Sequence, residues 1–482
     1  NGKIVNFEFD NDDDDPEYKL EIIANGYEYE IEIDAYSGKV LEFEKDDYDK
    51  DDKDDGDDEG IVENESGGDG RDGDDDSGGQ PSSDSQQYQA SINIDGTEKA
   101  IEVRIEDRKA VIELGELASE IFTGNQKTIV NIPSISDINS CTVEMPAEAL
   151  SSPGTSSMTV NTPWGSVTIP FGMLSTMKGN SGKTAGITIA AGDRTKLPEE
   201  VKAAIGDRPI LQLTLTLDGV KTAWNNPSAP VIVSIPYTPT AAEEESLESI
   251  VIWYIDVREN IITIPNGHYR QSTGGVSFST THFSDFAVAF EQVHFKDVPD
   301  GAWYDVAVSF IAAREITRGT GNGNFSPDNR LTRAEAITLI MRTYGIAPNT
   351  NPMDNFSDAG YTWYTGYLAA AKRLGISKGI GNNLFAPDIA ITRQEMFTLF
   401  YNALGAVKQL PSDTVNSGKT LSDFTDARQI DFWAREAMTL LVETGIVEGN
   451  AGKLMPLNTA TRAEMAQMLY NLMTIYNAKM FL

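Results

Sequence analysis

A four-residue pattern of threonine, arginine, a variable residue and glutamate occurs three times in the last third of this 482-residue chain. The copies are Thr332-Arg333-Ala334-Glu335, Thr392-Arg393-Gln394-Glu395 and Thr461-Arg462-Ala463-Glu464. A threonine followed three residues later by glutamate is typical of a capping box, in which both side chains accept hydrogen bonds from backbone N–H groups at the start of a helix. Each copy therefore predicts the first turn of a helix.

The arginine in each copy is not needed for capping. At the first helical position its guanidinium faces the positive end of the helix dipole, which is mildly unfavourable. A carboxylate or another anion would offset this cost, because a guanidinium binds planar anions through two parallel hydrogen bonds. Two partners are open for Arg333, Arg393 and Arg462: a carboxylate of a neighbouring repeat in a buried salt bridge, or an anionic ligand.

The sequence around these boxes repeats as a larger unit. Trp303-Tyr304 returns as Trp363-Tyr364, and Phe325-Ser326-Pro327-Asp328 returns as Phe385-Ala386-Pro387-Asp388, at an offset of 60 residues. Trp433 follows in a third copy. The apolar spacing predicts a helix, a glycine-rich loop and a second helix in each unit. For the tryptophans, packing in the core and contact with a ligand are both open.

These motifs resemble the S-layer homology (SLH) family. The resemblance begins at Phe295-Lys296-Asp297-Val298, covers about 180 residues and repeats its motifs in the same order three times. It implies an all-α unit with pseudo-threefold symmetry around a central helical bundle. It further implies a protein of a Gram-positive-type cell envelope whose repeats bind a secondary cell-wall polysaccharide, often one carrying a pyruvate ketal, in grooves between neighbouring repeats.

The resemblance also implies which residues meet the sugar. Aromatic rings would stack on it, amides of the glycine loops would contact its hydroxyls, and arginines would pair with the pyruvate carboxylate. The first groove set would be Asp297, Trp303, Gly319, Gly321 and Arg333, the second Asp358, Trp363, Gly379, Gly381 and Arg393, with Trp433 and Arg462 from the third copy. Arg318 and Lys378 stand before the glycine loops and suit an anionic polymer.

The third copy departs from this pattern. Glu448 stands where the first two copies have Arg318 and Lys378, and Met455-Pro456-Leu457-Asn458 replaces the Phe-x-Pro-Asp context. A carboxylate at this place repels an anionic sugar. The sequence therefore predicts that the third groove binds weakly or is only structural.

The formal net charge of −36 is unevenly distributed. Residues 1–87 carry a net charge of −25, residues 88–293 of −10 and residues 294–482 of −1. Such acidity excludes nucleic acid as a natural partner, since phosphate binding needs a basic face. No apolar run approaches a membrane span, which excludes membrane insertion. With three histidines and the single Cys141, neither a metal site nor a cofactor is expected, beyond loose calcium association at the aspartate runs 12–15 and 49–58.

Six segments follow from composition and pattern. Residues 1–44 alternate apolar and acidic residues, as in Tyr29-Glu30-Ile31-Glu32-Ile33-Asp34, and resemble part of a PepSY domain. The remaining segments are a disordered acidic linker at 45–87, an all-β, sandwich-like extracellular module at 88–293, and SLH repeats at 294–350, 351–415 and 416–482. The chain opens at Asn1-Gly2-Lys3 without a visible signal peptide, which indicates a processed or truncated chain.

The module at 88–293 ends in Thr281-His282-Phe283-Ser284. Together with Val167-Thr168-Ile169-Pro170 and Ile252-Trp253-Tyr254, this ending resembles the β-sandwich module of ankyrins and netrin receptors, some of which cut themselves between Phe and Ser. Such a cut would need Ser284 to attack the carbonyl of Phe283 with His282 as base. The alternative is that His282 is a packed polar residue at a strand start.

We expect a non-catalytic protein at the extracellular cell-wall or S-layer surface, anchored to a wall polysaccharide. The alternatives are a wall-anchored enzyme or protease regulator whose active part is absent from this chain, and a self-assembling S-layer subunit that also contacts other S-layer subunits.

Overall fold

The computed structural model describes residues 3–10, 17–24, 27–34, 40–47, 88–122, 127–151, 156–256, 260–410 and 417–476. The chain divides into two compact units, Asn1–Ser83 and Asp84–Leu482. Of the segment 45–87 that was predicted as a disordered acidic linker, residues 45–47 belong to a strand, and residues 48–87 lie outside the described residues.

The first unit is a four-stranded antiparallel sheet with its strands in chain order. They are β1 (Lys3–Asp10), β2 (Glu17–Ala24), β3 (Tyr27–Asp34) and β4 (Val40–Asp47). Tyr29 pairs with Lys45 across β3 and β4, and the Lys45 ammonium lies 3.5 Å from the ring centroid of Tyr27. The alternating pattern thus forms strands, and a cation over an aromatic ring helps to hold their pairing.

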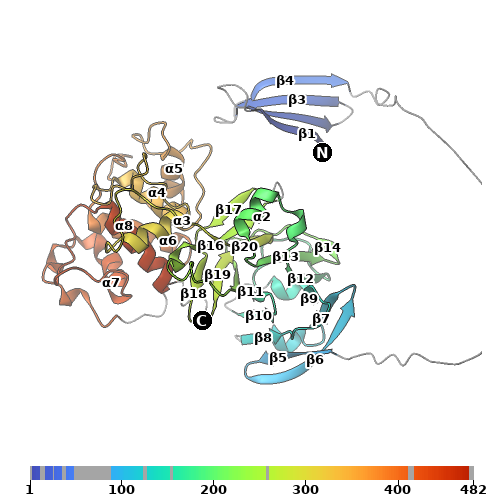
Figure 1. The fold of residues 1–482 in the computed structure, drawn as a ribbon. Coiled ribbons are helices and arrows are strands. Elements are labelled where there is room, and N and C mark those ends of the chain that lie inside the picture. Colours follow the sequence, from blue (N-terminus) through green and yellow to red (C-terminus); the bar gives the residue numbers. More distant parts are fainter. Residues whose placement is uncertain are drawn as a thin grey trace, which may run out of the picture. The chain divides into compact units, whose positions relative to one another are not determined.

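The described residues in the middle of the chain form a sheet of sixteen strands, fifteen of them in one path with β14 paired to β13 at its side. Figure 1 shows this region. They are β5 (Tyr88–Ile94), β6 (Thr97–Glu106), β7 (Lys109–Glu113), β8 (Lys127–Asn131), β9 (Ser140–Pro146), β10 (Ser157–Thr162), β11 (Gly165–Pro170), β12 (Thr184–Ala191), β13 (Ile210–Leu217), β14 (Val220–Lys221), β15 (Val231–Pro236), β16 (Ile250–Ile255), β17 (Ile261–Ile264), β18 (His268–Arg270), β19 (Gly275–Thr280) and β20 (Asp285–Phe290). The prediction of a β-rich middle region is confirmed.

The strand path has two halves joined at β6, which pairs with β5 in one half and with β7 in the other. One half runs β17-β16-β20-β13-β12-β9-β7, and the other runs β5-β8-β10-β11-β15-β19-β18. Side chains of both halves, such as Ile187 and Val167, share one apolar core. Cys141 is buried in this core, and its burial raises the pKa of the thiol to about 12. The thiol is therefore protonated and unreactive at neutral pH.

Two short helices accompany the strands, α1 (Ala118–Ile121) and α2 (Glu199–Ile205). The second begins directly after Pro198. Its buried Val201 and Ile205 pack with Val251, Trp253 and Ile255. Because β16 also contributes Ile250 and Ile252 to the main core, this strand is apolar on both faces and needs the helix as a cover.

The last part of the chain is helical, with two helices in each repeat. They are α3 (Asp305–Ala313), α4 (Arg333–Thr343), α5 (Thr365–Arg373), α6 (Arg393–Ala406), α7 (Arg435–Glu443) and α8 (Arg462–Asn471). The second helix of each repeat packs on the first helix of the next: α4 on α5, α6 on α7, and α8 back on α3. One apolar core runs through all three repeats. The repeats therefore close into a ring rather than extending as an open array.

The β region and the first repeat meet at a buried arginine. Arg314 follows α3 and is 1% exposed. Its Nε donates to the carbonyl of Gly267 (3.0 Å), Nη2 to that of Ile250 (3.0 Å), and Nη1 to those of Glu248 (2.7 Å) and Phe310 (3.0 Å). Three of these carbonyls belong to the β region. Ala313 also packs in the cluster formed by α2 and β16, so the two regions share a desolvated junction.

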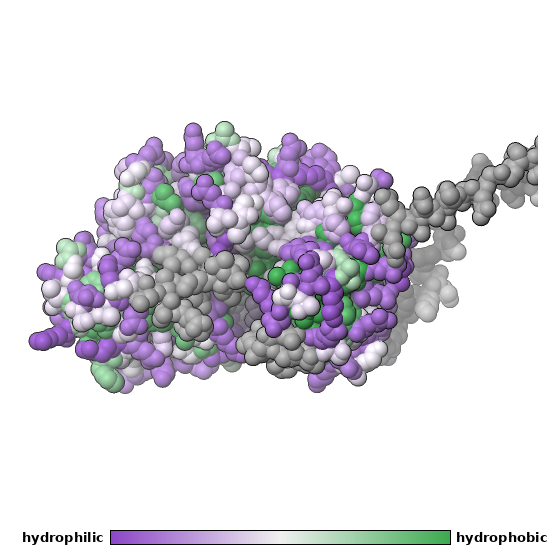
Figure 2. Space-filling view, turned by 90° about the horizontal axis from the view of Figure 1, so that it is seen from below, coloured by the Kyte–Doolittle hydropathy of each residue, from purple (hydrophilic) through white to green (hydrophobic). Residues whose placement is uncertain are grey.

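Among the described residues, no helix combines the length and apolarity that crossing a bilayer requires. No group of three or more His, Cys, Asp or Glu side chains in this part of the chain is arranged to hold a metal ion. On the face seen in Figure 2, hydrophilic residues predominate and apolar ones form small separate areas.

Candidate functional site

The glycine loop of each repeat is held by an aspartate of the motif that opens the repeat. The two carboxylate oxygens of Asp297 accept hydrogen bonds from the backbone N–H groups of Phe325 and Ser326, both at 2.7 Å. Asp358 binds Phe385 and Ala386 in the same way, at 2.8 and 2.7 Å. Asp297 and Asp358, predicted as sugar contacts, thus have both oxygens occupied by the loop and serve to position it.

The first glycine of each loop is required by close packing. Gly319 has a φ of +77°, and a Cβ there would lie 2.6 Å from the ring of Phe295. Gly379 has a φ of +74°, and its Cβ would lie 2.8 Å from the ring of Phe356. Gly321 and Gly381 also have positive φ, but a Cβ at either would meet nothing within 4 Å. The first glycine of each pair lets the loop lie on an aromatic ring, and the second supplies only the turn.

All three capping boxes are present as predicted. Thr332, Thr392 and Thr461 accept from the backbone N–H of Glu335, Glu395 and Glu464, and each glutamate accepts from the N–H of its threonine. Each box uses one oxygen of its glutamate, Oε2, on the threonine. The other oxygen, Oε1, is left for a second partner.

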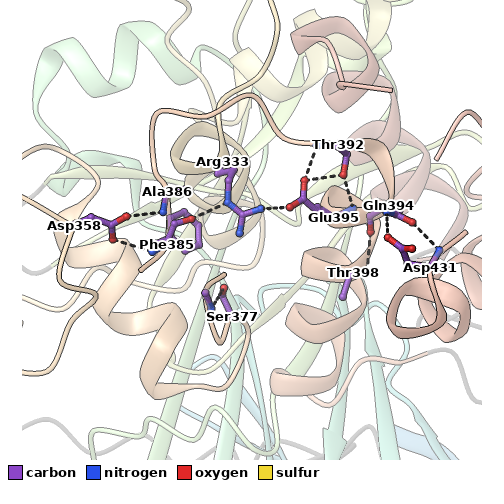
Figure 3. A network of polar contacts seen from close by, with 11 residues as sticks. Arg333, Asp358, Ser377, Phe385, Ala386, Thr392, Gln394, Glu395, Thr398 and Asp431 are labelled. Atoms are coloured by element: carbon purple, nitrogen blue, oxygen red, sulfur yellow. Dashed lines mark hydrogen bonds and ion pairs between the residues drawn. The ribbon is translucent and has the colours of Figure 1, made fainter. Parts of the chain in front are cut away.

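That second partner is the arginine of another repeat. Arg333 Nη1 lies 2.6 Å from Glu395, Arg393 Nη1 lies 2.6 Å from Glu464, and Arg462 Nη1 lies 2.8 Å from Glu335. Figure 3 shows the first pair, with Arg333 between Glu395 and the carbonyl of Phe385. The three pairs, which we call the arginine ring, link repeat 1 to 2, 2 to 3 and 3 back to 1.

Of the two roles left open for the arginines, the structure shows the salt bridge between repeats. Arg333 is 5% exposed, Arg393 9% and Arg462 5%. Burial lowers the pKa of Arg333 and Arg462, and the adjacent Glu395 and Glu335 oppose this effect. A guanidinium stays charged at neutral pH, so each buried cation is compensated by a carboxylate in contact with it. A ligand in contact with these arginines would bind the guanidinium N–H groups that the glutamates and the loop carbonyls leave unused.

The arginine ring changes the grouping of the predicted site residues. The Nε atoms of Arg333, Arg393 and Arg462 donate to Phe385, Leu454 and Phe325, which belong to the loop of the following repeat. Arg333 therefore lies at the second loop and Arg393 at the third. Trp303 lines a cavity with Arg393 and Glu448, so it also belongs to the third loop. The predicted sets that joined Trp303 with Arg333, and Trp363 with Arg393, were wrong in this respect.

This cavity measures about 640 Å³ and lies between the second helices of repeats 2 and 3. Its walls come from the third glycine loop, α6, α8 and Trp303. The helices pack in the same order around the ring: α8 on α3, α4 on α5 and α6 on α7. Trp303 of the first repeat lies at the loop of the third repeat, which precedes it in the ring. The same order assigns Trp363 to the first loop and Trp433 to the second. A groove thus consists of a loop, an arginine from the preceding repeat and a tryptophan from the following one.

The three tryptophans project into solvent instead of packing in the core. Trp303 is 62% exposed, Trp363 59% and Trp433 51%, and the first two form T-shaped ring pairs with Tyr304 and Tyr364. A large apolar ring that is half exposed is available to a ligand. The basic residues before the loops are exposed as well, with Arg318 3.1 Å from Glu315 on the surface.

Two features of the grooves were missed by sequence reasoning. Asp426 holds the third loop through Leu454 and Met455, and the shared Phe-x-Asp spacing with Asp297 and Asp358 is a signal that could have found it. In addition, Asn402 and Asn471 donate to the carbonyls of Ile376 and Ile446 at the loop starts. No local pattern pointed to these asparagines.

The residues considered for self-cleavage do not form a catalytic pair. The Ser284 hydroxyl donates to the carbonyl of Ile255 at 2.8 Å. His282 Nδ1 lies 3.4 Å from the Thr280 hydroxyl, and its ring packs against Tyr254 and Phe286. Burial lowers the pKa of His282. The histidine is positioned as the packed residue of the alternative reading.

From this geometry we expect the full chain to run as one band on denaturing electrophoresis, because Ser284 is not hydrogen-bonded to a base. The measurement compares the purified chain with Ser284→Ala after prolonged incubation. Two fragments meeting at Phe283 and Ser284 in the unmodified chain, and their loss in the variant, would contradict the expectation.

Comparisons with known proteins agree with the helical geometry. The family description "S-layer homology domain" matches residues 294–337, 355–397 and 423–466, and "Peptidase propeptide and YPEB domain" (PepSY) matches residues 1–44. The chain is 31% identical over 175 residues to "S-layer protein sap" of Bacillus anthracis, which is 36% of this chain and 20% of that protein.

Two enzymes are also similar. "Amylopullulanase" of Thermoanaerobacterium thermosulfurigenes is 30% identical over 226 residues, 46% of this chain and 12% of that protein. "Exoglucanase XynX" of Acetivibrio thermocellus is 27% identical over 267 residues, 53% of this chain and 24% of that protein. The chain thus spans less than a quarter of the length of these relatives.

The threefold loop, cap and salt-bridge arrangement and these matches define the class: the chain is an SLH-domain protein. It has three S-layer homology repeats at residues 294–466 and a PepSY segment at its N-terminus. SLH repeats indicate anchoring to the cell wall and a location at the cell surface.

Proposed function

We propose that the chain is a non-catalytic surface protein whose three repeats bind an acidic secondary cell-wall polysaccharide, the first two grooves taking its carboxylated units. The observation that carries the proposal is the set of exposed tryptophans beside glycine loops, with Arg318 and Lys378 at the first two loops. An aromatic face packs on the apolar face of a sugar ring, and a nearby cation favours a carboxylated one.

The β region then has a role beside the anchor. The β region, with its two halves on a shared core, is proposed to be a sandwich-like extracellular module held against the first repeat by Arg314. Its outward partner is a further surface component, such as other S-layer subunits.

The central test is binding of the full chain to purified cell walls, before and after chemical removal of the wall polysaccharide. The full chain is used because the first repeat is packed on the β region through Arg314. Binding is expected to disappear with the polysaccharide. Binding that survives its removal would refute the proposal.

Replacing one exposed tryptophan, Trp363→Ala or Trp433→Ala, is expected to weaken wall binding roughly two- to tenfold, because a stacked aromatic ring contributes about 0.5–1.5 kcal/mol. The measurement is a sedimentation titration of the chain with purified walls. Val220→Ala, at a residue 67% exposed on β14, is the matched control and should bind as the unmodified chain does. Equal binding by all three variants would contradict the assignment of the grooves.

A second function, a wall-anchored enzyme, is favoured by one observation: the amylopullulanase and the exoglucanase share part of their sequence with this chain. The sequence of the gene upstream of Asn1 separates the alternatives, because a catalytic domain there would replace the non-catalytic reading. Lattice formation by the purified chain, with and without calcium, tests the S-layer subunit.

A further inference from the structure

The three grooves differ in charge at their entrances. Arg318 and Lys378 stand before the first and second glycine loops, whereas Glu448 stands before the third and is exposed. The arginine ring is neutral within each groove, since every arginine is paired with a glutamate. The residue before the loop is therefore a cation at two grooves, with Arg318 paired to Glu315 and Lys378 in no described ion pair, and a carboxylate at the third.

A lysine near Glu448 binds its backbone and not its carboxylate. The Lys419 ammonium lies 3.4 Å from the backbone carbonyl of Glu448, and it donates to that carbonyl. Among the residues that the structure describes, no ion pair of the Glu448 carboxylate is found within 4.0 Å. The carboxylate is therefore available to accept a hydrogen bond from a ligand.

The third loop also presents a different hydrogen-bonding edge. In the first two loops, the N–H groups of Gly319 and Gly379 donate to the hydroxyls of Thr317 and Ser377, both at 3.1 Å. Val447 occupies the equivalent place in the third loop, and its apolar side chain cannot accept a hydrogen bond. Among the described residues, no hydrogen bond of the Gly449 N–H is found either, and Gly449 lines the cavity.

Apolar side chains complete the difference. Met455 stands where the first two repeats have Ser326 and Ala386, and it lines the 640 Å³ cavity together with Val447 and Trp303. The groove thus combines an apolar wall, an aromatic face, one N–H donor and one carboxylate. An acetamido group has the matching parts: a methyl, a carbonyl that accepts and an N–H that donates.

We propose that the third groove takes an N-acylated amino sugar that carries no carboxylate, while the other two take carboxylated units. This inference rests on the proposed function, since it assumes that the grooves bind sugar. It also makes the prediction of weak binding at the third groove more specific, because only anionic sugars are expected to bind weakly there. Glu448 is the specificity-determining residue, and Gly449 and Met455 form the complementary surface.

The test uses two probes that differ by one carboxylate-bearing ether, N-acetylglucosamine and N-acetylmuramic acid. Each is titrated into the isotope-labelled full chain, and the amide resonances of Gly319, Gly379 and Gly449 report the three loops separately. Gly449 is expected to shift with N-acetylglucosamine and to respond to N-acetylmuramic acid at least fivefold more weakly, since like charges in contact at high dielectric cost roughly 1 kcal/mol.

Two variants give the decisive comparison. Glu448→Lys, which copies the residue of the second loop, should reverse the preference at Gly449, and the reciprocal Lys378→Glu should weaken N-acetylmuramic acid at Gly379. An unchanged preference in Glu448→Lys overturns the inference, as does a Gly449 amide that responds to neither probe or equally to both. If the full chain fails to bind purified walls at all, it is the proposed function that fails.

Discussion

Replacing Arg333 by alanine is expected to destabilise the three-repeat unit by about 3–5 kcal/mol. The buried guanidinium is hydrogen-bonded to the Phe385 carbonyl at 2.8 Å and to Glu395 at 2.6 Å. Its removal leaves a partly buried carboxylate without its cation and a buried carbonyl without its donor. The measurement is urea unfolding followed by the helical circular-dichroism signal, to which the long helices of the repeats contribute most.

A matched control is available in the same repeat. Arg318 pairs with Glu315 at 3.1 Å, but the two side chains are 82% and 56% exposed. Because water and salt screen such a pair, Arg318→Ala should cost less than about 1 kcal/mol. Equal shifts of the urea midpoint for Arg318→Ala and Arg333→Ala would show that the arginine ring does not stabilise the repeats.

Arg333→Lys tests the geometry of the ring. A lysine keeps the charge but has one nitrogen, which cannot reach both the Phe385 carbonyl and Glu395 as the planar guanidinium does. We therefore expect a midpoint between those of the unmodified chain and Arg333→Ala. A lysine variant as stable as the unmodified chain would mean that charge alone holds neighbouring repeats together.

Arg314→Met is expected to open the junction between the β region and the first repeat. Methionine fills much of the buried volume, yet it leaves the carbonyls of Gly267, Glu248 and Ile250 without donors, and each unsatisfied buried acceptor costs about 1–3 kcal/mol. The β region and the repeats should then separate locally. The connection at residues 291–304 should become sensitive to proteases, measured by the rate of limited proteolysis and by the masses of the fragments.

Arg342→Met is the matched control for the junction. Arg342 donates to the Tyr367 hydroxyl at 3.3 Å and to the Ile316 carbonyl at 3.4 Å, both within the repeats. Its loss removes an arginine and two longer hydrogen bonds without touching the β region. Proteolysis at 291–304 should stay slow in this variant. Fast cleavage in both variants, or in neither, would contradict a junction held by Arg314.

Several elements could be read from the sequence because their causes are local. The capping boxes depend on two side chains three residues apart, and all three occur as predicted. The strands of the β region follow from short apolar runs between turn residues. The repeat period and its order of motifs also identified the SLH class, since copies of one unit must bury the same faces.

The partners of the arginines, by contrast, were decided only by the tertiary structure. Arg333, Arg393 and Arg462 meet glutamates 62, 71 and 127 residues away, and Trp303 meets a loop that begins more than 140 residues later. Closing the ring brings the third repeat back to the first, and no spacing within a single repeat encodes that closure. For the same reason no sequence pattern indicated that Arg314 joins the repeats to the β region.

The threonine–arginine–glutamate pattern therefore has two separate roles, one in capping a helix and one in joining neighbouring repeats. The sequence by itself determined the helix starts, because threonine and glutamate satisfy backbone donors within one turn. Only the fold decided what the arginine does, because a long, fully charged side chain takes its partner from whatever carboxylate the packed helices bring within reach. Here that carboxylate is the second oxygen of the next repeat's own capping glutamate.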